Sequence, residues 1–192
     1  MSRSCRALAL SAILLTLALP ACAKEDAPLA WPAPQVHGFA KGMFISDDKK
    51  GGRPNQNTPG FGGKLGAETG EYLGFKLKGA WYATTDLGLR QEDPRKTDAY
   101  MFDLDKKPYS ILGEMQLSAR LGNTALILGR QEFFSPIINT YDYRIIPNLF
   151  DAYMLTNRDI PDTTVTFAYD SKMSGLDGLV TFSEFRSMTQ QA

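Results

Sequence analysis

The chain has 192 residues, with 21 basic and 21 acidic side chains and a formal net charge of zero. Balanced charge gives no basic footprint for nucleic acid, and a single histidine leaves almost nothing for histidine-based catalysis or metal binding. We therefore expect no enzyme, no catalytic residue, no cofactor, no metal site and no nucleic-acid partner.

The first 23 residues have the three parts of a secretory signal peptide. Arg3 and Arg6 precede an apolar run over 7–19, and Ala21-Cys22-Ala23 forms a cleavage site. An uncleaved anchor helix is the alternative, although the run is shorter than the ~20 residues of a membrane span. The sequence around Cys22 also resembles a lipoprotein box, so lipidation is a second alternative. Cleavage would remove both cysteines and leave an exported chain without disulfides.

Apolar and polar residues alternate along most of the remaining chain, which predicts strands and no helix. Residues 24–35 contain three prolines and form a flexible leader in this interpretation. The expected strands are 36–46, 60–69, 72–85, 109–121, 124–132, 149–157, 163–170 and 178–186, followed by a tail at 187–192. Short turns at 122–123 and 159–162 alternate with long polar loops at 47–59, 86–108 and 133–148. That organisation is typical of an antiparallel, up-and-down outer-membrane β-barrel.

The two faces of these strands have opposite polarity, and we assign the apolar face to lipid. The lipid side would take Leu73, Phe75, Leu77, Met115 and Leu117. The water-filled side would take Lys76, Lys78, Glu114, Gln116, Arg120 and Arg130. We expect Trp81, Tyr82, Tyr109, Tyr153 and Tyr169 near the membrane interfaces. The alternative is a β-sandwich, or a lipid-binding barrel with an apolar interior.

The loop at 133–148 is too apolar for a plain solvated connection. Its isoleucines, with Phe150 beyond it, provide a reason to fold inward and pack: Ile137, Ile138, Ile145 and Ile146. Fixed charges at a constriction set a barrier for one sign of solute. We therefore predict a pore constriction at Asp142, Tyr143, Arg144 and Asn148. The alternative is an external loop with a solvated arginine.

Residues 129–151 resemble the signature of OprD-type outer-membrane porins. The matching positions are Gly129-Arg130-Gln131, Ser135-Pro136, Asn139, Asp142, Arg144, Ile146-Pro147-Asn148 and Phe150-Asp151. The chain has Ser135, Ile146 and Asp151 where the pattern has Thr, Met and Glu. Weaker similarity extends over 36–186. The resemblance implies a barrel of about eighteen strands with this loop as its constriction. It also implies passive, partly selective uptake of small polar or anionic solutes, guided by Arg130 and Arg144 with Asp142 as the opposing charge.

Eight strands are fewer than the resemblance implies, and the chain ends in a polar tail rather than in an aromatic strand end. These observations favour the N-terminal part of a porin, from a C-terminally truncated copy. The alternatives are a complete small eight-stranded structural barrel and an exported β lipoprotein, neither with channel activity. In the favoured interpretation the protein is exported to the outer membrane of a Gram-negative cell. Its partners would be outer-membrane lipid, small solutes and the barrel-assembly machinery.

Overall fold

The computed structural model describes residues 32–48, 51, 54–98, 101–135, 138–176 and 181–188. The chain divides into two units, 1–30 and 31–192, and the described residues all belong to the second. The predicted signal peptide, the candidate lipidation site at Cys22 and most of the predicted leader lie outside the described residues. Within those residues, no helix has the length and apolarity needed to cross a membrane.

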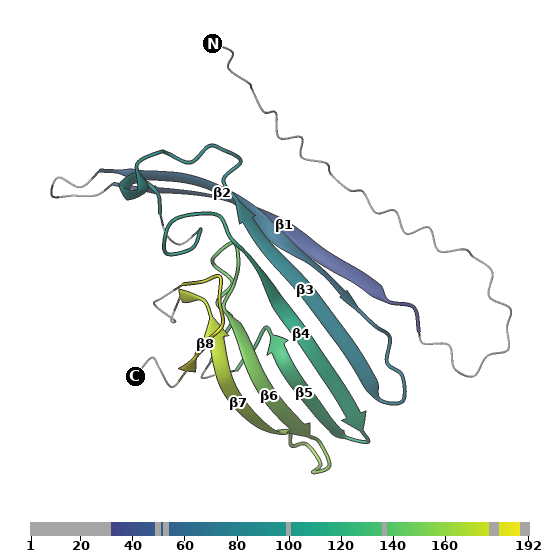
Figure 1. Ribbon diagram of the computed structural model, residues 1–192. Coiled ribbons are helices and arrows are strands. Elements are labelled where there is room, and N and C mark those ends of the chain that lie inside the picture. Colours follow the sequence, from purple (N-terminus) through teal and green to yellow (C-terminus); the bar gives the residue numbers. More distant parts are fainter. Residues whose placement is uncertain are drawn as a thin grey trace, which may run out of the picture. The chain divides into compact units, whose positions relative to one another are not determined.

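The strands form a single antiparallel sheet in which each strand pairs with its neighbours in sequence (Figure 1). They are β1 (Gln35–Asp47), β2 (Gln56–Glu68), β3 (Phe75–Thr85), β4 (Ser110–Leu121), β5 (Thr124–Gln131), β6 (Leu149–Asn157), β7 (Val165–Ser174) and β8 (Arg186–Ser187). One 3-10 turn, η1 (Pro94–Lys96), interrupts the long loop between β3 and β4. The predicted all-β, up-and-down topology is confirmed. The sandwich alternative is wrong, because the described strands make one layer and not two.

Short and long connections lie at opposite ends of the sheet, as the sequence predicted (Figure 1). The connection between β4 and β5 is the pair Gly122-Asn123, where Leu121 faces Thr124 and Gly122 has a φ of 58°. A glycine with positive φ at the first central position suits a tight hairpin, because it matches the twist of the flanking strands. The long connections all lie at the other end, and they carry the candidate site.

Several predicted strands differ from those in the structure. β2 begins at Gln56, within the predicted loop at 47–59, and β7 covers Val165–Ser174 rather than 163–170. The prediction of a strand over 178–186 is wrong: residues 181–185 form no strand, and β8 is only Arg186–Ser187. The strand predicted to begin at Tyr72 begins at Phe75, because Leu73 and Gly74 form a turn with φ values of 50° and 82°. Alternation cannot reveal such a turn when one of its residues is a leucine.

Among the described residues, loops cover one face of the sheet and leave the other uncovered; we call them the loop-covered face and the open face. The open face carries large exposed apolar side chains, namely Val36, Phe44, Phe61, Leu65, Phe75, Leu77, Trp81, Met115, Leu117, Tyr153, Leu155, Phe167 and Tyr169. The residues predicted to face lipid are all exposed, including Leu73 in its turn. In a chain whose loops bury apolar residues elsewhere, a large exposed apolar surface indicates an apolar environment around it.

The predicted interfacial aromatics divide between the two faces. Trp81, Tyr153 and Tyr169 are exposed on the open face, which is the side that the prediction requires. The expectation is wrong for Tyr82, which is buried and hydrogen-bonds to two carboxylates on the loop-covered face. It is also wrong for Tyr109, which packs against a buried cluster. Alternation places Tyr82 opposite Trp81, so two adjacent aromatic residues cannot both face lipid.

The loop between β5 and β6, which we call the central loop (132–148), packs on the loop-covered face. Ile145 and Ile146 are fully buried there with Tyr82 and with Phe102 from the 86–109 loop. The predicted inward packing of the loop is confirmed for these isoleucines, whereas Ile137 lies outside the described residues. The alternative of an external loop with a solvated arginine is wrong, because Arg144 is 1% exposed.

Glycines in β2 leave space that Ile145 of the central loop fills, and Gly113 in β4 leaves space for Leu149 and Tyr82. A Cβ atom on Gly60 would lie 2.9 Å from Ile145 Cδ1, and one on Gly62 would lie 2.5 Å from Ile145 Cγ2. On β4, a Cβ on Gly113 would meet Leu149 Cδ1 and Tyr82 Cδ2, both at 2.5 Å. Contacts below 3 Å force a neighbour to move. At these positions, therefore, only glycine leaves room for the side chains that pack there.

Gly60→Val should therefore push Met101 and Ile145 off the sheet, because a Cβ there would lie 2.6 Å from Met101 Sδ and 2.9 Å from Ile145 Cδ1. Overpacking a filled site costs about 1–3 kcal/mol, and the urea midpoint of the folded protein in detergent should fall accordingly. Gly42→Val is the matched control, because Gly42 pairs with Phe61 on the open face and has only that ring within reach of a new Cβ. Equal midpoints for the two variants would contradict this account of the glycines.

Candidate functional site

A network of charged side chains crosses the loop-covered face, centred on Glu114. This glutamate is fully buried, yet its oxygens meet two lysines: Oε1 lies 2.5 Å from Lys64 Nζ and Oε2 lies 2.7 Å from Lys78 Nζ. Lys64 also pairs with Glu132 at 3.0 Å. The network joins β2, β3, β4 and the start of the central loop. A buried carboxylate is tolerated when it is paired and hydrogen-bonded in this way.

Tyr82 links the two carboxylates of the network. Its hydroxyl lies 2.6 Å from Glu114 Oε1 and 2.6 Å from Glu132 Oε1. A phenol has one proton, so the hydroxyl donates to one carboxylate at a time, while Lys64 donates to both. Two lysines and two glutamates make the network neutral as a whole. It fixes the wall of the sheet rather than adding net charge to it.

Arg144 lies inside the packing of the loops. Its guanidinium carbon is 3.8 Å from the ring centroid of Phe182, and Nη2 donates to the carbonyl oxygen of Phe102 at 3.5 Å. These contacts come from the 181–188 segment and the 86–109 loop, so one cation joins three loops. A desolvated cation on an aromatic face contributes up to about 2 kcal/mol. In the described chain Arg144 holds the loops together rather than facing solvent.

Asn148 is also buried and has a similar positioning role. Its Oδ1 accepts a hydrogen bond from the backbone N–H of Leu176, and its own N–H donates to the carbonyl of Thr140. Gly175 lies against it, and a Cβ there would come within 2.1 Å of Asn148 Oδ1. Asn148 therefore joins the central loop to the chain after β7.

Asp142 and Tyr143 are the predicted constriction residues that remain exposed. The side chain of Asp142 pairs with Lys41 on β1, with Oδ1 2.6 Å from Nζ. Tyr143 makes an edge contact with Tyr141, their ring centroids 6.4 Å apart. The structure thus separates the four predicted constriction residues into an exposed pair and a buried pair.

The predicted water-facing residues are placed as follows. Lys76, Lys78, Glu114, Gln116 and Arg120 share the loop-covered face through the register of β3 and β4. Lys76 pairs with Glu68 at 2.7 Å. Arg120 is exposed near the short-turn end. Arg130 donates to the carbonyl of Leu112, and its guanidinium lies 4.5 Å from the ring centroid of Phe185.

Sequence reasoning missed Lys41, Lys64, Glu132 and the role of Tyr82. Alternation in β2 places Lys64 on the same face as Gly62, but the glycine-rich sequence hides the pattern. Lys41 could have been assigned to the charged face from the period-2 rule, whereas that rule places Glu132 with Leu128 on the open face. The partners of both residues could not have been assigned, because those lie on other strands and in the central loop. The described residues contain no group of three or more potential metal ligands.

Asp103 anchors the 86–109 loop to the 181–188 segment. It accepts hydrogen bonds from the backbone N–H of Phe182 at 2.7 Å and from Ser183 Oγ at 2.5 Å. Burial alone would raise the pKa of Asp103, but these bonds, with one from the Leu104 N–H, outweigh it and lower the pKa below its usual value. The ionised form therefore stabilises the ring that Arg144 stacks on.

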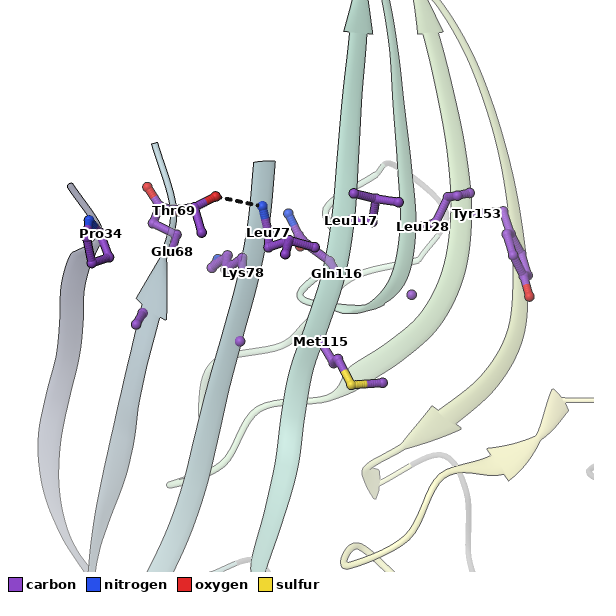
Figure 2. A pocket seen from close by; sticks show the side chains of 13 residues that line it. Pro34, Glu68, Thr69, Leu77, Lys78, Met115, Gln116, Leu117, Leu128 and Tyr153 are labelled. Carbon is purple, nitrogen blue, oxygen red and sulfur yellow. Dashed lines mark hydrogen bonds between the residues drawn. The ribbon is translucent and has the colours of Figure 1, made fainter. Parts of the chain in front are cut away.

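The open face carries a shallow apolar groove of about 630 Å³ (Figure 2). Leu77, Met115, Leu117, Leu128 and Tyr153 supply its apolar side chains. Its floor includes Gly79 and Gly129, where the backbone is bare. Glu68, Thr69, Lys78 and Gln116 also line the groove, but most of its exposed surface is apolar. The groove is therefore part of the apolar belt, and the candidate site is on the other face.

Glu114→Gln should destabilise the sheet by about 3 kcal/mol, because it leaves Lys78 facing a neutral group in a buried site and Lys64 with Glu132 as its one carboxylate. Urea unfolding in detergent, followed by tryptophan fluorescence, measures the loss. Glu68→Gln is the control, since the Glu68–Lys76 pair is partly exposed and such pairs contribute less than about 1 kcal/mol. A loss for Glu114→Gln no larger than for Glu68→Gln would argue against the network.

The anchor at Asp103 predicts a pH dependence. Its folded-state pKa lies below the usual 3.8, so its stabilisation is complete above that pH and is lost as pH falls through the lowered value. The free energy of unfolding of the wild type should exceed that of Asp103→Asn by about 1 kcal/mol near neutral pH. This difference should shrink in acid. The urea midpoints of both proteins from pH 7 to pH 3 test this. A difference that stays constant over that range would rule it out.

Comparison with known proteins identifies the fold. No protein-family model and no curated protein matches the sequence. Among solved structures, OccK9 (OpdG) of Pseudomonas aeruginosa has a TM-score of 0.65 and 22% identity, covering 80% of this chain and 40% of its own. OccAB2 of Acinetobacter baumannii has a TM-score of 0.64 and 17% identity, covering 80% and 38%. A BenF-like porin of Pseudomonas fluorescens Pf-5 has a TM-score of 0.62 and 15% identity, covering 80% and 39%.

These neighbours are channel porins of the OprD family and not enzymes. They confirm the resemblance found in residues 129–151 at the level of the fold. The chain spans about 40% of the length of the OccK9 structure. The described sheet therefore has the fold of part of a large outer-membrane β-barrel of the OprD porin type.

Proposed function

We propose that the chain forms part of the wall and the constriction of an outer-membrane porin for passive, partly selective diffusion of small solutes. One observation carries the proposal: a single sheet presents apolar side chains on its open face and a charged network on the face over which the central loop folds. A soluble β-protein buries its apolar face. Here the arrangement is reversed, as it is in barrels that enclose water.

The dimensions of the apolar face fit a bilayer. On β3 the exposed side chains on this face run from Phe75 to Ala83. Eight residue steps of ~3.3 Å span about 26 Å along the strand, and a strand tilt of ~40° reduces this to about 20 Å of membrane thickness. That is close to the apolar band of outer-membrane barrels. The proposed location is the outer membrane of a Gram-negative cell, reached by the predicted signal peptide and the barrel-assembly machinery.

The proposed constriction is the central loop. Asp142 and Tyr143 face the solute, while Arg144 and Asn148 hold the loop in place from behind. Lys76, Lys78, Glu114, Gln116, Arg120 and Arg130 line the wet wall. Most of these charges are paired, so the wall presents few uncompensated charges to a passing solute.

Anionic solutes are the proposed preference, and Arg120 supports it. This side chain is exposed, and in the described part of the chain it has no carboxylate within ion-pair distance. An uncompensated cation on a wet wall lowers the barrier for anions and raises it for cations. OpdK of Pseudomonas aeruginosa, a structural neighbour at 13% identity and a TM-score of 0.61, was solved with vanillate, a small carboxylate.

Reconstitution in planar bilayers tests the proposal. We expect discrete conductance steps and a reversal potential that favours anions in a salt gradient. Arg120→Gln should weaken the anion preference, because it removes the uncompensated cation. Arg95→Gln is the matched control, since Arg95 is exposed and already paired with Asp93 in the 86–109 loop. Folded protein that shows no conductance would refute the pore function.

A further inference from the structure

Lys41 of β1 reaches across the sheet to the exposed tip of the central loop. Its ammonium donates to Asp142 Oδ1 at 2.6 Å and to the carbonyl oxygen of Arg144 at 3.0 Å. These acceptors lie about one hundred residues along the chain from Lys41. One strand of the wall therefore holds two points of the same loop through a single side chain.

The site of this contact is the exposed part of the loop. Tyr141 and Tyr143 are both about half exposed, and the Asp142 side chain between them is 60% exposed. Tyr141 has a φ of 47°, a left-handed conformation that costs a non-glycine residue about 1–2 kcal/mol. A strained and exposed turn needs contacts that hold it, and Lys41 supplies two of them.

The contact also changes which cation a solute would meet. Arg144 matches the porin signature, but its guanidinium is buried against Phe182 and Phe102. The Lys41 side chain retains 25% exposure beside the exposed carboxylate of Asp142. At the loop tip, therefore, the accessible cation is a lysine from β1 and not the arginine of the loop.

We propose that Lys41 is a positioning and selectivity-determining residue of the central loop. It clamps the loop tip onto β1, and it offsets the charge of Asp142 at the constriction. The electrostatic half of this inference rests on the proposed pore function, whereas the clamp does not. The experiment has one part for each.

Hydrogen–deuterium exchange of the folded protein in detergent tests the clamp. Lys41→Met keeps the aliphatic stem and removes both donated bonds. It should raise exchange of backbone amides in 139–144 by roughly two- to tenfold, the range for a partly exposed charged contact. Asp142→Asn should raise exchange in the same segment. Because the two residues act through one contact, the double variant should exceed the larger single effect only slightly.

Two control variants separate loss of the Lys41 contact from general effects of substituting a lysine. Lys76→Met removes a paired lysine from the same face without touching the loop, and exchange in 139–144 should stay at the wild-type level. Lys41→Arg keeps the charge and should retain most of the protection. If Lys41→Met does not fold, Asp142→Asn, which removes the same ion pair, takes its place in the comparison. The clamp proposal would be overturned if backbone amides in 139–144 of Lys41→Met exchanged at the wild-type rate. It would also be overturned if the effects of the two substitutions added in the double variant.

Reversal potentials test the selectivity. Lys41→Met leaves the Asp142 carboxylate uncompensated and should shift preference toward cations, while Asp142→Asn should shift it toward anions. Lys96→Met, in the η1 turn of the 86–109 loop, should leave the reversal potential unchanged. If the protein conducts and neither Lys41→Met nor Asp142→Asn changes its reversal potential, the proposed electrostatic role of these residues is wrong. Folded protein that does not conduct would refute the pore function, and the exchange experiment would still decide the clamp.

Discussion

The structure depends on one packing constraint, the fit of Ile145 into the space left by the glycines of β2. Side chains at Gly60 or Gly62 would occupy the volume of the isoleucine. Once Ile145 is seated, the neighbouring residues of the loop have fixed places: Arg144 is directed into the other loops, and Asp142 lies within reach of β1. Apolar burial thus positions charges that could not position themselves, because ionic contacts at a wet surface are individually weak.

Polar contacts then decide what the seated loop presents. Arg144 carries its charge into the packing of three loops, where the Phe182 ring and the Phe102 carbonyl compensate part of its lost hydration. Asp103 orients the same segment from the other side through the Phe182 N–H. The result is a loop whose structural cation is hidden and whose exposed carboxylate is balanced by Lys41. A resemblance in sequence identifies both charged positions of the loop, but it does not distinguish their exposure.

Alternation predicted the strands and the polarity of the two faces, turn and loop lengths predicted the sheet order, and the isoleucines of the central loop predicted its inward packing. These properties follow from local periodicity and turn residues, which act within a few positions. The missed features depend on an unusual local backbone or on contacts between distant residues. The turn at Leu73-Gly74 requires an unusual backbone at a leucine, and the burial of Tyr82 follows from carboxylates on two other elements. Lys41 was missed because its partner lies across the sheet.

The central claim is that lipid contacts the open face and water contacts the loop-covered face. Single cysteines along β3, in a chain with Cys5 and Cys22 replaced by serine, measure this directly when a fluorophore on each is challenged with lipid-soluble and water-soluble quenchers in bilayers. The account predicts that labels at Phe75, Leu77 and Trp81 respond to the lipid-soluble quencher, and that labels at Lys76 and Lys78 respond to the water-soluble one. The opposite alternation, or no alternation at all, would contradict it.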